Sequence, residues 1–157
     1  MPRITPNLWF DTEAEEAAEF YCSIFPNSKI TAVSRYPEGG PGKAGTAMTV
    51  SWVLDGQDFT GINGGPHFTF SEAVSLAVNC ADQAEIDYYW EKLTDGGEES
   101  QCGWLKDRYG MSWQVVPADW EDVWTSADPG GPERAMQAMM GMKKLDIATL
   151  KAAAQGA

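Results

Sequence analysis

The stretch LWFDTEAEEAAEFYCSIF at residues 8–25 decides the fold, because a strand pattern passes directly into a helix pattern. Residues 4–10 are rich in branched and aromatic side chains, which strands favour. Asp11 and Thr12 then offer oxygen atoms for an N-cap, and Pro26 is expected to end the helix. The apolar side chains between these points recur at helical spacing. They are Ala17, Phe20, Tyr21, Ile24 and Phe25.

Strand patterns follow this helix and complete a unit of the order β-α-β-β-β. Asp55 and Gly56 join two of these strands, and this dipeptide is a strong signal for a β-hairpin. The expected strands cover residues 29–36, 46–54 and 57–63.

The same order returns after a linker at Gly64, Gly65 and Pro66, which indicates an internal duplication. Asp82 is the expected N-cap of a second helix, which runs to about Thr94. The expected strands of this second copy cover residues 73–79, 98–101, 104–107 and 112–116.

Residues 118–157 depart from the repeat and are expected to form a helical extension. An isolated helical tail of this length is marginal in water, so it should pack on the body or on a partner subunit. The predicted fold class is therefore α+β, with tandem βαβββ modules at residues 1–63 and 67–117. Together these modules form one domain, residues 1–117, and the helical extension belongs to it. The expected tail helices cover residues 119–124, 132–141 and 145–154.

The chain has 157 residues, with 11 Lys and Arg against 23 Asp and Glu, and a formal net charge of -12. This acidity argues against nucleic acid and membranes as partners, because their phosphates need neutralisation by Lys and Arg. The three cysteines do not form a disulfide framework. No apolar run suits a signal peptide or a membrane helix, so we expect a cytoplasmic protein.

Short motifs along both modules carry a family resemblance. They are ITPNLWF at 4–10, FTGINGGP at 59–66, YWEKL at 89–93, QCGWLKD at 101–107 and SWQVVP at 112–117. In these motifs the chain resembles the vicinal oxygen chelate superfamily. This superfamily includes glyoxalase I, extradiol dioxygenases, and bleomycin or fosfomycin resistance proteins. Within it, the chain is similar to the PhnB-like branch, often labelled demethylubiquinone methyltransferase-like. The resemblance implies a pair of curved mixed-sheet half-barrels around a cavity, and a homodimer.

Metalloenzymes of this superfamily bind a divalent ion through His, Gln or Glu on the first and last strand of each module. The matching positions here are Thr5, Thr60 or a neighbour, Ala73 and Gln114. A catalytic divalent ion needs about three imidazole, carboxylate or thiolate ligands, and these residues supply one weak amide oxygen. We therefore expect neither a metal nor another cofactor. A Gly-rich strand-to-helix turn for S-adenosylmethionine is also missing from the pattern.

Strand alternation predicts which side chains line the cavity, because every second residue shares a face. Trp113 and Val115 should point to the helices, whereas Ser112 and Val116 should go with Gln114. An aromatic wall with a few polar groups is typical of small-molecule sites, although a filled barrel interior is the alternative. The expected cavity residues are Thr5, Asn7, Trp9, Thr60, Ser75, Trp104 and Gln114.

His67 and Cys102 are the candidate catalytic residues. His67 is the only histidine and would titrate near neutral pH as a general acid or base, unless it merely anchors the linker. Cys102 could be an exposed nucleophile, although a structural thiol is favoured because no second histidine is available to form a thiolate. Glu72 precedes a buried strand and is expected to pair with Arg35 or Lys106.

These patterns favour a protein that binds a small molecule in a cavity that has lost the usual metal site. One alternative is an enzyme of the lyase, dioxygenase or transferase type that acts on a small organic substrate in the same cavity. Another is a dimeric interaction module, whose cavity is vestigial and whose helical tail mediates assembly. The sequence leaves open whether the chain is an enzyme.

Overall fold

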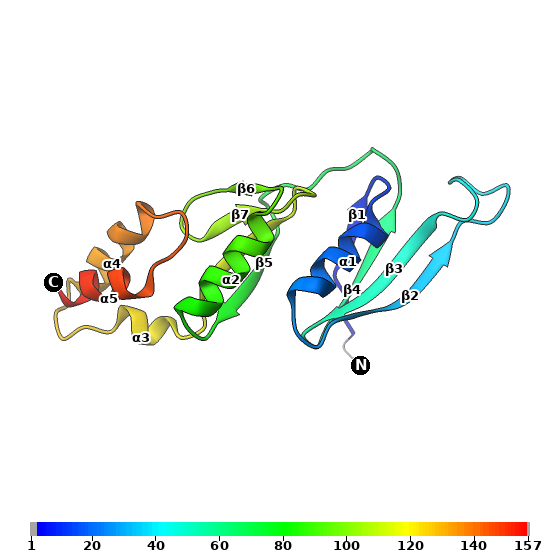
Figure 1. Ribbon diagram of the computed structural model, residues 1–157. Helices are drawn as coiled ribbons and strands as arrows, with labels where there is room; N and C mark the ends of the chain where they lie inside the picture. Colours follow the sequence, from blue (N-terminus) through cyan, green and yellow to red (C-terminus); the bar gives the residue numbers. More distant parts are fainter. Residues whose placement is uncertain (1–2, 157) are drawn as a thin grey trace. The chain divides into compact units, whose positions relative to one another are not determined.

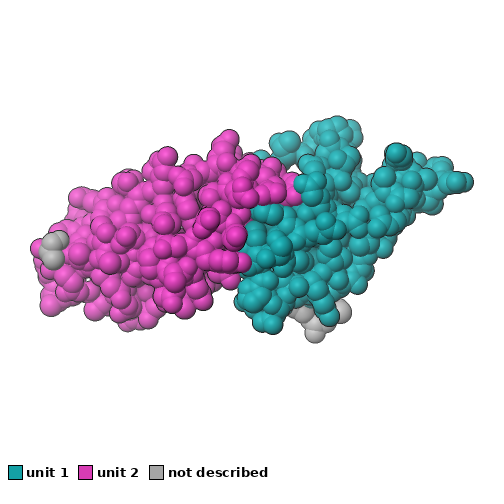
Figure 2. Space-filling model, viewed as in Figure 1, with its two compact units in different colours: residues 1–70 teal, residues 71–157 magenta. Residues whose placement is uncertain are grey.

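A computed structural model describes residues 3–156. The chain divides into two compact units, unit 1 at residues 1–70 and unit 2 at residues 71–157 (Figure 2). Each unit holds a four-stranded sheet with a helix after its first strand. The duplicated order β-α-β-β-β and the α+β class are therefore confirmed, and neither sheet closes into a barrel.

Unit 1 contains sheet A, in the strand order β1-β4-β3-β2. Strand β1 is parallel to β4, and the other neighbours are antiparallel. Helix α1 packs on one face of this sheet (Figure 1). The elements are β1 (Asn7–Phe10), α1 (Ala14–Ile24), β2 (Lys29–Arg35), β3 (Ala47–Leu54) and β4 (Gln57–Asn63).

The core of unit 1 lies between sheet A and α1. Trp52 is 1% exposed, and its ring stacks on Phe59 with centroids 5.8 Å apart. A side chain at Gly61 would place Cβ 2.9 Å from the Trp52 ring, so only glycine fits there without a shift. The apolar face of α1 that covers this layer consists of Ala14, Ala17, Ala18, Tyr21 and Ile24.

The expected N-cap of α1 at Asp11 or Thr12 is wrong. Glu13 occupies the N-cap position and makes no side-chain cap bond. Instead the buried Asn63 accepts a hydrogen bond from the Ala14 N–H through Oδ1, at 2.9 Å. Its Nδ2 donates to the Ala47 carbonyl at 3.0 Å, so one amide joins α1, β3 and β4.

Strand β2 forms one edge of sheet A and is mostly exposed. Its pairing with β3 shifts register between Ile30 and Ala32 and again between Ser34 and Arg35. The hairpin between β3 and β4 is regular and confirms the expected turn. Asp55 and Gly56 have φ angles of 44° and 88°, the two positive values of a type I′ hairpin turn.

Unit 2 contains sheet B, in the order β5-β8-β7-β6 with β5 parallel to β8. Helix α2 covers one face (Figure 1), and the expected cap is confirmed because Asp82 accepts from the Glu85 N–H at 2.9 Å. The elements are β5 (Ser75–Cys80), α2 (Gln83–Thr94), β6 (Glu98–Glu99), β7 (Trp104–Lys106) and β8 (Ser112–Pro117).

The first strand of each module starts later than expected, at Asn7 and at Ser75. Pro6 has no N–H to contribute to a ladder, which limits the strand on that side. Its carbonyl still accepts from the Thr60 N–H at 3.0 Å.

The C-terminal helices pack on the rest of unit 2. This confirms the expectation that the tail packs on the body, the first of the two places expected for it. They are α3 (Trp120–Trp124), α4 (Gly131–Met140) and α5 (Ile147–Gln155). Gln83 of α2 donates to the Leu145 carbonyl at 3.0 Å and accepts from the Ile147 N–H at 2.8 Å. The N–H groups of Cys102 and Gly103 donate to carbonyls of the segment between α4 and α5, each at 2.8 Å. The shared core is Val116, Val123, Leu145 and Leu150.

None of the helices in the described part of the chain has the length and apolar character that crossing a bilayer needs.

Candidate functional site

The face of sheet A opposite α1 carries the expected cavity residues of the first module. Asn7 lies opposite Thr60, and Trp9 lies opposite Ile62. Thr60 and Ser51 place their hydroxyl oxygens 3.5 Å apart on this face. Thr5 precedes β1 and accepts a hydrogen bond from Asn7 Nδ2 through its carbonyl, at 2.9 Å. This open face of sheet A thus carries amide and hydroxyl groups together with the Trp9 indole and the Ile62 side chain.

Trp9 is held in place by the linker that follows sheet A. Its Nε1 donates to the Gly65 carbonyl at 2.9 Å, and Phe68 meets the indole edge-on at 5.0 Å. A Cβ at Gly64 would lie 2.1 Å from the indole. Glycine at position 64 therefore lets the backbone lie against this ring, and Gly65 adopts a φ of 94°, which favours glycine.

His67 lies at a different place, a pocket of ≈ 640 Å³ at the end of sheet A beside the start of α1. Tyr36 contributes to its wall and donates from Oη to the Asn63 carbonyl at 2.5 Å. The expected cavity residues of unit 1 do not line this pocket. Its other polar lining groups are Asp11, Thr12, Lys43 and Thr46.

The open face of sheet B, opposite α2, carries Ser75, Trp104 and Gln114. Gln114 Nε2 donates to Ser75 Oγ at 2.9 Å, and Trp104 lies opposite Gln114 in the β7–β8 ladder. The opposite face is closed, because Trp113 is 3% exposed and Val115 is fully buried. Both residues therefore point to the helix side, as strand alternation predicts.

Val116 shares a face with Gln114 but does not contribute to an open surface. The C-terminal helices cover it, and it is 7% exposed within their shared core with Leu145 and Leu150. The open face of sheet B is therefore confined to the part around Gln114, Trp104 and the residues nearer the start of β8.

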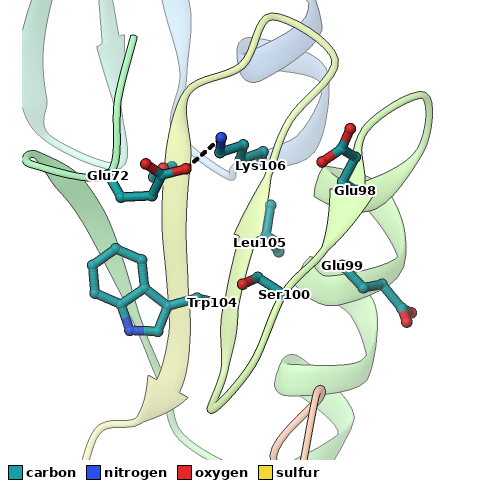
Figure 3. A pocket seen from close by; sticks show the side chains of 8 residues that line it. Glu72, Glu98, Glu99, Ser100, Trp104, Leu105 and Lys106 are labelled. Carbon is teal, nitrogen blue, oxygen red and sulfur yellow. Dashed lines mark ion pairs between the residues drawn. The ribbon is translucent and has the colours of Figure 1, made fainter.

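A pocket of ≈ 180 Å³ opens on this face, beside Trp104 (Figure 3). Glu72 and Lys106 form an ion pair in it, which confirms one of the two expected partners of Glu72. Arg35 pairs instead with Glu15 at 3.1 Å. The hydrogen bond between the partners lowers the pKa of Glu72 and raises the pKa of Lys106. Both groups are therefore charged at neutral pH.

Ser112 lines the same pocket and has an unusual environment. The residue is 1% exposed, and its Oγ has no hydrogen-bond partner among the described residues. It lies opposite Lys106 on one side and opposite Ser75 on the other. Sequence reasoning assigned Ser112 to the cavity face but not to the site, and it missed Lys106 as a lining residue. Strand alternation could have identified both residues, because it places Lys106 on the same face as Trp104 and Ser112 on the same face as Gln114.

Cys102 occupies a structural position. Its φ is 60°, in the left-handed region, and its N–H donates to the Met142 carbonyl, so it forms part of the turn on which the tail packs. Burial raises the pKa of the Cys80 thiol to about 12, with Glu85 and Asp82 adding to the effect, and burial also raises the pKa of Cys22. These two thiols therefore remain protonated at neutral pH.

The residues at the metal positions of the superfamily do not fit a divalent ion. Thr5, Ala73 and Gln114 offer no imidazole, carboxylate or thiolate, and the Gln114 amide is bonded to Ser75. Within residues 3–156, no group of three or more His, Cys, Asp and Glu side chains could hold a metal ion together.

The comparisons with known proteins agree with this fold. The family described as 3-demethylubiquinone-9 3-methyltransferase matches residues 2–116. A solved putative 3-demethylubiquinone-9 3-methyltransferase, the PhnB protein from Bacillus cereus, is 41% identical, with a TM-score of 0.68. The match covers 73% of this chain and 99% of that one. No curated protein matches the chain.

Two more distant solved structures show the fold alone. A protein from Pseudomonas aeruginosa is 20% identical with a TM-score of 0.63, over 76% of this chain and 100% of that one. The fosfomycin resistance protein FosX from Listeria monocytogenes, solved with Mn(II) and sulfate, is 14% identical with a TM-score of 0.54. That match covers 76% of this chain and 94% of the FosX chain.

Proposed function

Because this chain belongs to the 3-demethylubiquinone-9 3-methyltransferase family, the PhnB-like branch of the vicinal oxygen chelate fold, we propose that it binds a small organic molecule without a metal ion. The ligand would contact an open sheet face, and each unit presents one such face. Fold alone does not assign this role, so it rests on the side chains that those faces present. The proposed lining residues are Thr5, Asn7, Trp9, Thr60, Ser75, Trp104 and Gln114.

One observation carries the proposal, the hydrogen-bonded pair of Gln114 and Ser75 beside Trp104. The pair fixes the position of an amide and a hydroxyl on a partly open sheet face. An aromatic side chain lies at the neighbouring cross-strand position and is only partly buried. Fixed polar groups next to an aromatic surface are what small-molecule sites use for orientation and for affinity, respectively.

The donor set supports binding through hydrogen bonds and apolar contacts rather than through a metal. Amide and hydroxyl groups at Gln114, Ser75 and Thr60 can each donate and accept, which suits a neutral or polar organic ligand. They lack the negative or imidazole character that a divalent ion requires.

The methyl transfer in the family's description is not part of the proposal. The turn between β1 and α1 contains Asp11, Thr12 and Glu13, without the glycines that let a nucleotide approach the backbone. At the matching turn before α2, the Asp82 carboxylate already accepts the hydrogen bond of the Glu85 N–H, so this donor is not free for a cofactor. Neither turn therefore has the Gly-rich pattern that a methyl-donor site of the Rossmann type uses.

Native mass spectrometry of the protein purified from its own host tests the proposal. We expect a co-purified small molecule, and we expect Gln114→Leu to weaken its binding by about tenfold, the effect of one lost hydrogen bond. Gln57→Leu, at an exposed position at the start of β4, makes the same chemical change away from the open faces and should retain the ligand. Equal occupancy in both variants, or no ligand in the wild type, would contradict the proposal.

A cytoplasmic location is part of the same proposal. All three cysteines are free thiols, and Cys80 is buried in the core of unit 2. Free structural thiols are usual in a reducing compartment.

We also propose that the protein is a homodimer that uses the exposed methionines of α4. Met136 is 47% exposed and Met140 is 65% exposed, and the spacing of four residues places them on one side of the helix. We expect the double substitution Met136→Lys and Met140→Lys to convert the dimer to a monomer, as measured by light scattering after gel filtration. Gln137→Lys adds a charge to the same helix and should leave the dimer intact. A monomeric wild type, or a double variant that stays dimeric, would exclude this interface.

A further inference from the structure

The open face of sheet A, opposite α1, carries uncharged side chains in two neighbouring rows that run across its strands. The first row contains Trp9, Ile62, Thr49 and Ser34, and the second contains Asn7, Thr60 and Ser51. The side chains of both rows are exposed or half-buried, so a ligand can reach them. These rows therefore form a neutral region, although the chain has a formal net charge of -12.

Charged side chains border this neutral region but do not enter it. In the next row of the same face, Val53 lies opposite Asp58 on one side and opposite Lys29 on the other. Arg35 belongs to the helix side, where it pairs with Glu15 of α1 at 3.1 Å. With strands ~4.8 Å apart and same-face residues ~7 Å apart, the neutral region measures about 14 by 7 Å.

The size of the neutral region favours a small molecule over a protein partner. Its area is on the order of 100 Å², whereas a specific protein interface takes about 800 Å² from each partner. One ring with a short substituent covers an area of this order.

An aromatic pair forms the apolar end of the neutral region. Trp9 and Phe68 meet edge-on with ring centroids 5.0 Å apart, and Ile62 lies opposite Trp9 in the β1–β4 ladder. Phe68 is 65% exposed, so most of its ring is available for contact. The Trp9 indole is held in this position because its Nε1 donates to the Gly65 carbonyl at 2.9 Å. A surface that is already fixed costs a ligand less ordering when it binds.

Asn7 and Thr60 form the polar end of the neutral region and lie opposite each other in the β1–β4 ladder. Asn7 Nδ2 donates to the Thr5 carbonyl at 2.9 Å, so Oδ1 is the atom that can accept from a ligand. The hydroxyl oxygens of Thr60 and Ser51 are 3.5 Å apart, longer than the usual ~2.8 Å, so the Thr60 hydroxyl can turn to a better partner. A hydrogen-bond acceptor and a hydroxyl therefore lie side by side.

We propose that the open face of sheet A binds an uncharged organic molecule, with an apolar ring against the Trp9–Phe68 pair and one alcohol or amide group at Asn7 and Thr60. This group donates to Asn7 Oδ1 and accepts from the Thr60 hydroxyl. The inference rests on the proposed function, names the chemical class of the ligand and places it on unit 1. A charged ligand is disfavoured because contact with this face would remove its water without supplying an opposite charge.

Titration of the full chain with probes of similar size and different charge tests the inference. The probes are benzyl alcohol, benzoate and benzylammonium. The Trp9 indole N–H signal in NMR is the readout, and Trp9→Phe identifies this signal by its loss. Molecules this small are expected to bind with a dissociation constant of about 1–10 mM, so the titration covers that range. We expect a saturable shift with benzyl alcohol and about tenfold weaker binding of benzoate and benzylammonium.

Variants separate binding from folding in this experiment. Thr60→Val removes the hydroxyl and keeps the shape of the side chain, so we expect about tenfold weaker binding of benzyl alcohol at a similar melting temperature. Phe68→Ala removes a ring that is 65% exposed and should also weaken binding without unfolding unit 1. Thr149→Val makes the same chemical change as Thr60→Val at an exposed position of α5 and should bind as the wild type does.

The inference is overturned by the absence of a saturable shift with benzyl alcohol, by a charged probe that binds as tightly, or by full affinity in Thr60→Val or Phe68→Ala. The two proposals fail differently. A charged molecule that co-purifies and is released by Gln114→Leu would keep the proposed function and exclude the uncharged ligand. The absence of any co-purified molecule together with no response to benzyl alcohol would exclude both.

Discussion

Replacing Trp52 with alanine is expected to lower the free energy of unfolding by about 3–5 kcal/mol, the usual cost of deleting a large buried aromatic side chain. The ring is 1% exposed and lies at the centre of unit 1. It stacks on Phe59 at 5.8 Å and meets Tyr21 of α1 at 6.2 Å. Gly61 leaves no side chain that could move into the space, so the cavity would remain open.

Trp52→Phe is the matched control for this prediction. It retains a ring that can stack on Phe59, and it removes an indole N–H that has no hydrogen-bond partner among the described residues. We expect a loss of about 1 kcal/mol, because the smaller ring leaves a smaller cavity. Urea denaturation followed by circular dichroism measures both variants. Similar losses in the two variants would show that the indole volume is not what stabilises unit 1.

Replacing Asp107 with asparagine is expected to cost about 2–4 kcal/mol, because hydrogen bonds to a buried charge are strong and unpaired donors are costly. Asp107 is 3% exposed. Its Oδ2 accepts from Trp113 Nε1 at 2.8 Å, and its Oδ1 accepts from the N–H groups of Tyr109 and Met111 at 2.8 and 3.1 Å. Asparagine keeps only one acceptor oxygen, so its NH₂ group would face another donor.

Asp146→Asn is the control for the same substitution at a different kind of site. Asp146 is exposed and caps α5 by accepting from the Thr149 N–H at 2.8 Å. Asparagine is as good an N-cap as aspartate, so we expect little change in stability. The comparison uses the urea midpoint of each variant. A loss at Asp107 no larger than the loss at Asp146 would contradict the role of its second carboxylate oxygen.

Local signals in the sequence were sufficient for much of the fold. The hairpin at Asp55 and Gly56 and the cap at Asp82 depend on neighbouring residues only, and both were predicted correctly. The start of α1 was not, because its cap comes from Asn63, at a separation of 49 residues. A side chain that reaches the helix from another strand leaves no local pattern, so the acidic residues before α1 were mistaken for the cap.

The candidate site divides in the same way. Alternation along single strands was enough to place Trp113 and Val115 on the helix side and Gln114 with Ser75 on the other. The charges around Ser112 depend on how β6, β7 and β8 pair, and the register of short strands cannot be read from one sequence. The cover over Val116 depends on where the tail packs. His67 lies in the linker, outside any strand, so strand alternation could not predict that it lines a pocket.

The exposed edge of sheet A has a consequence for the behaviour of the protein in concentrated solution. A sheet with an open face and a regular edge strand invites another chain to extend it strand by strand. On the β2 side, two register shifts interrupt the row of hydrogen-bonding groups, and Lys29 places a positive charge at the start of the strand. Like charges on an approaching copy would repel, and the bulges would misalign its backbone. The edge at β2 therefore disfavours growth into fibres, although sheet A leaves its face opposite α1 uncovered by its own helix.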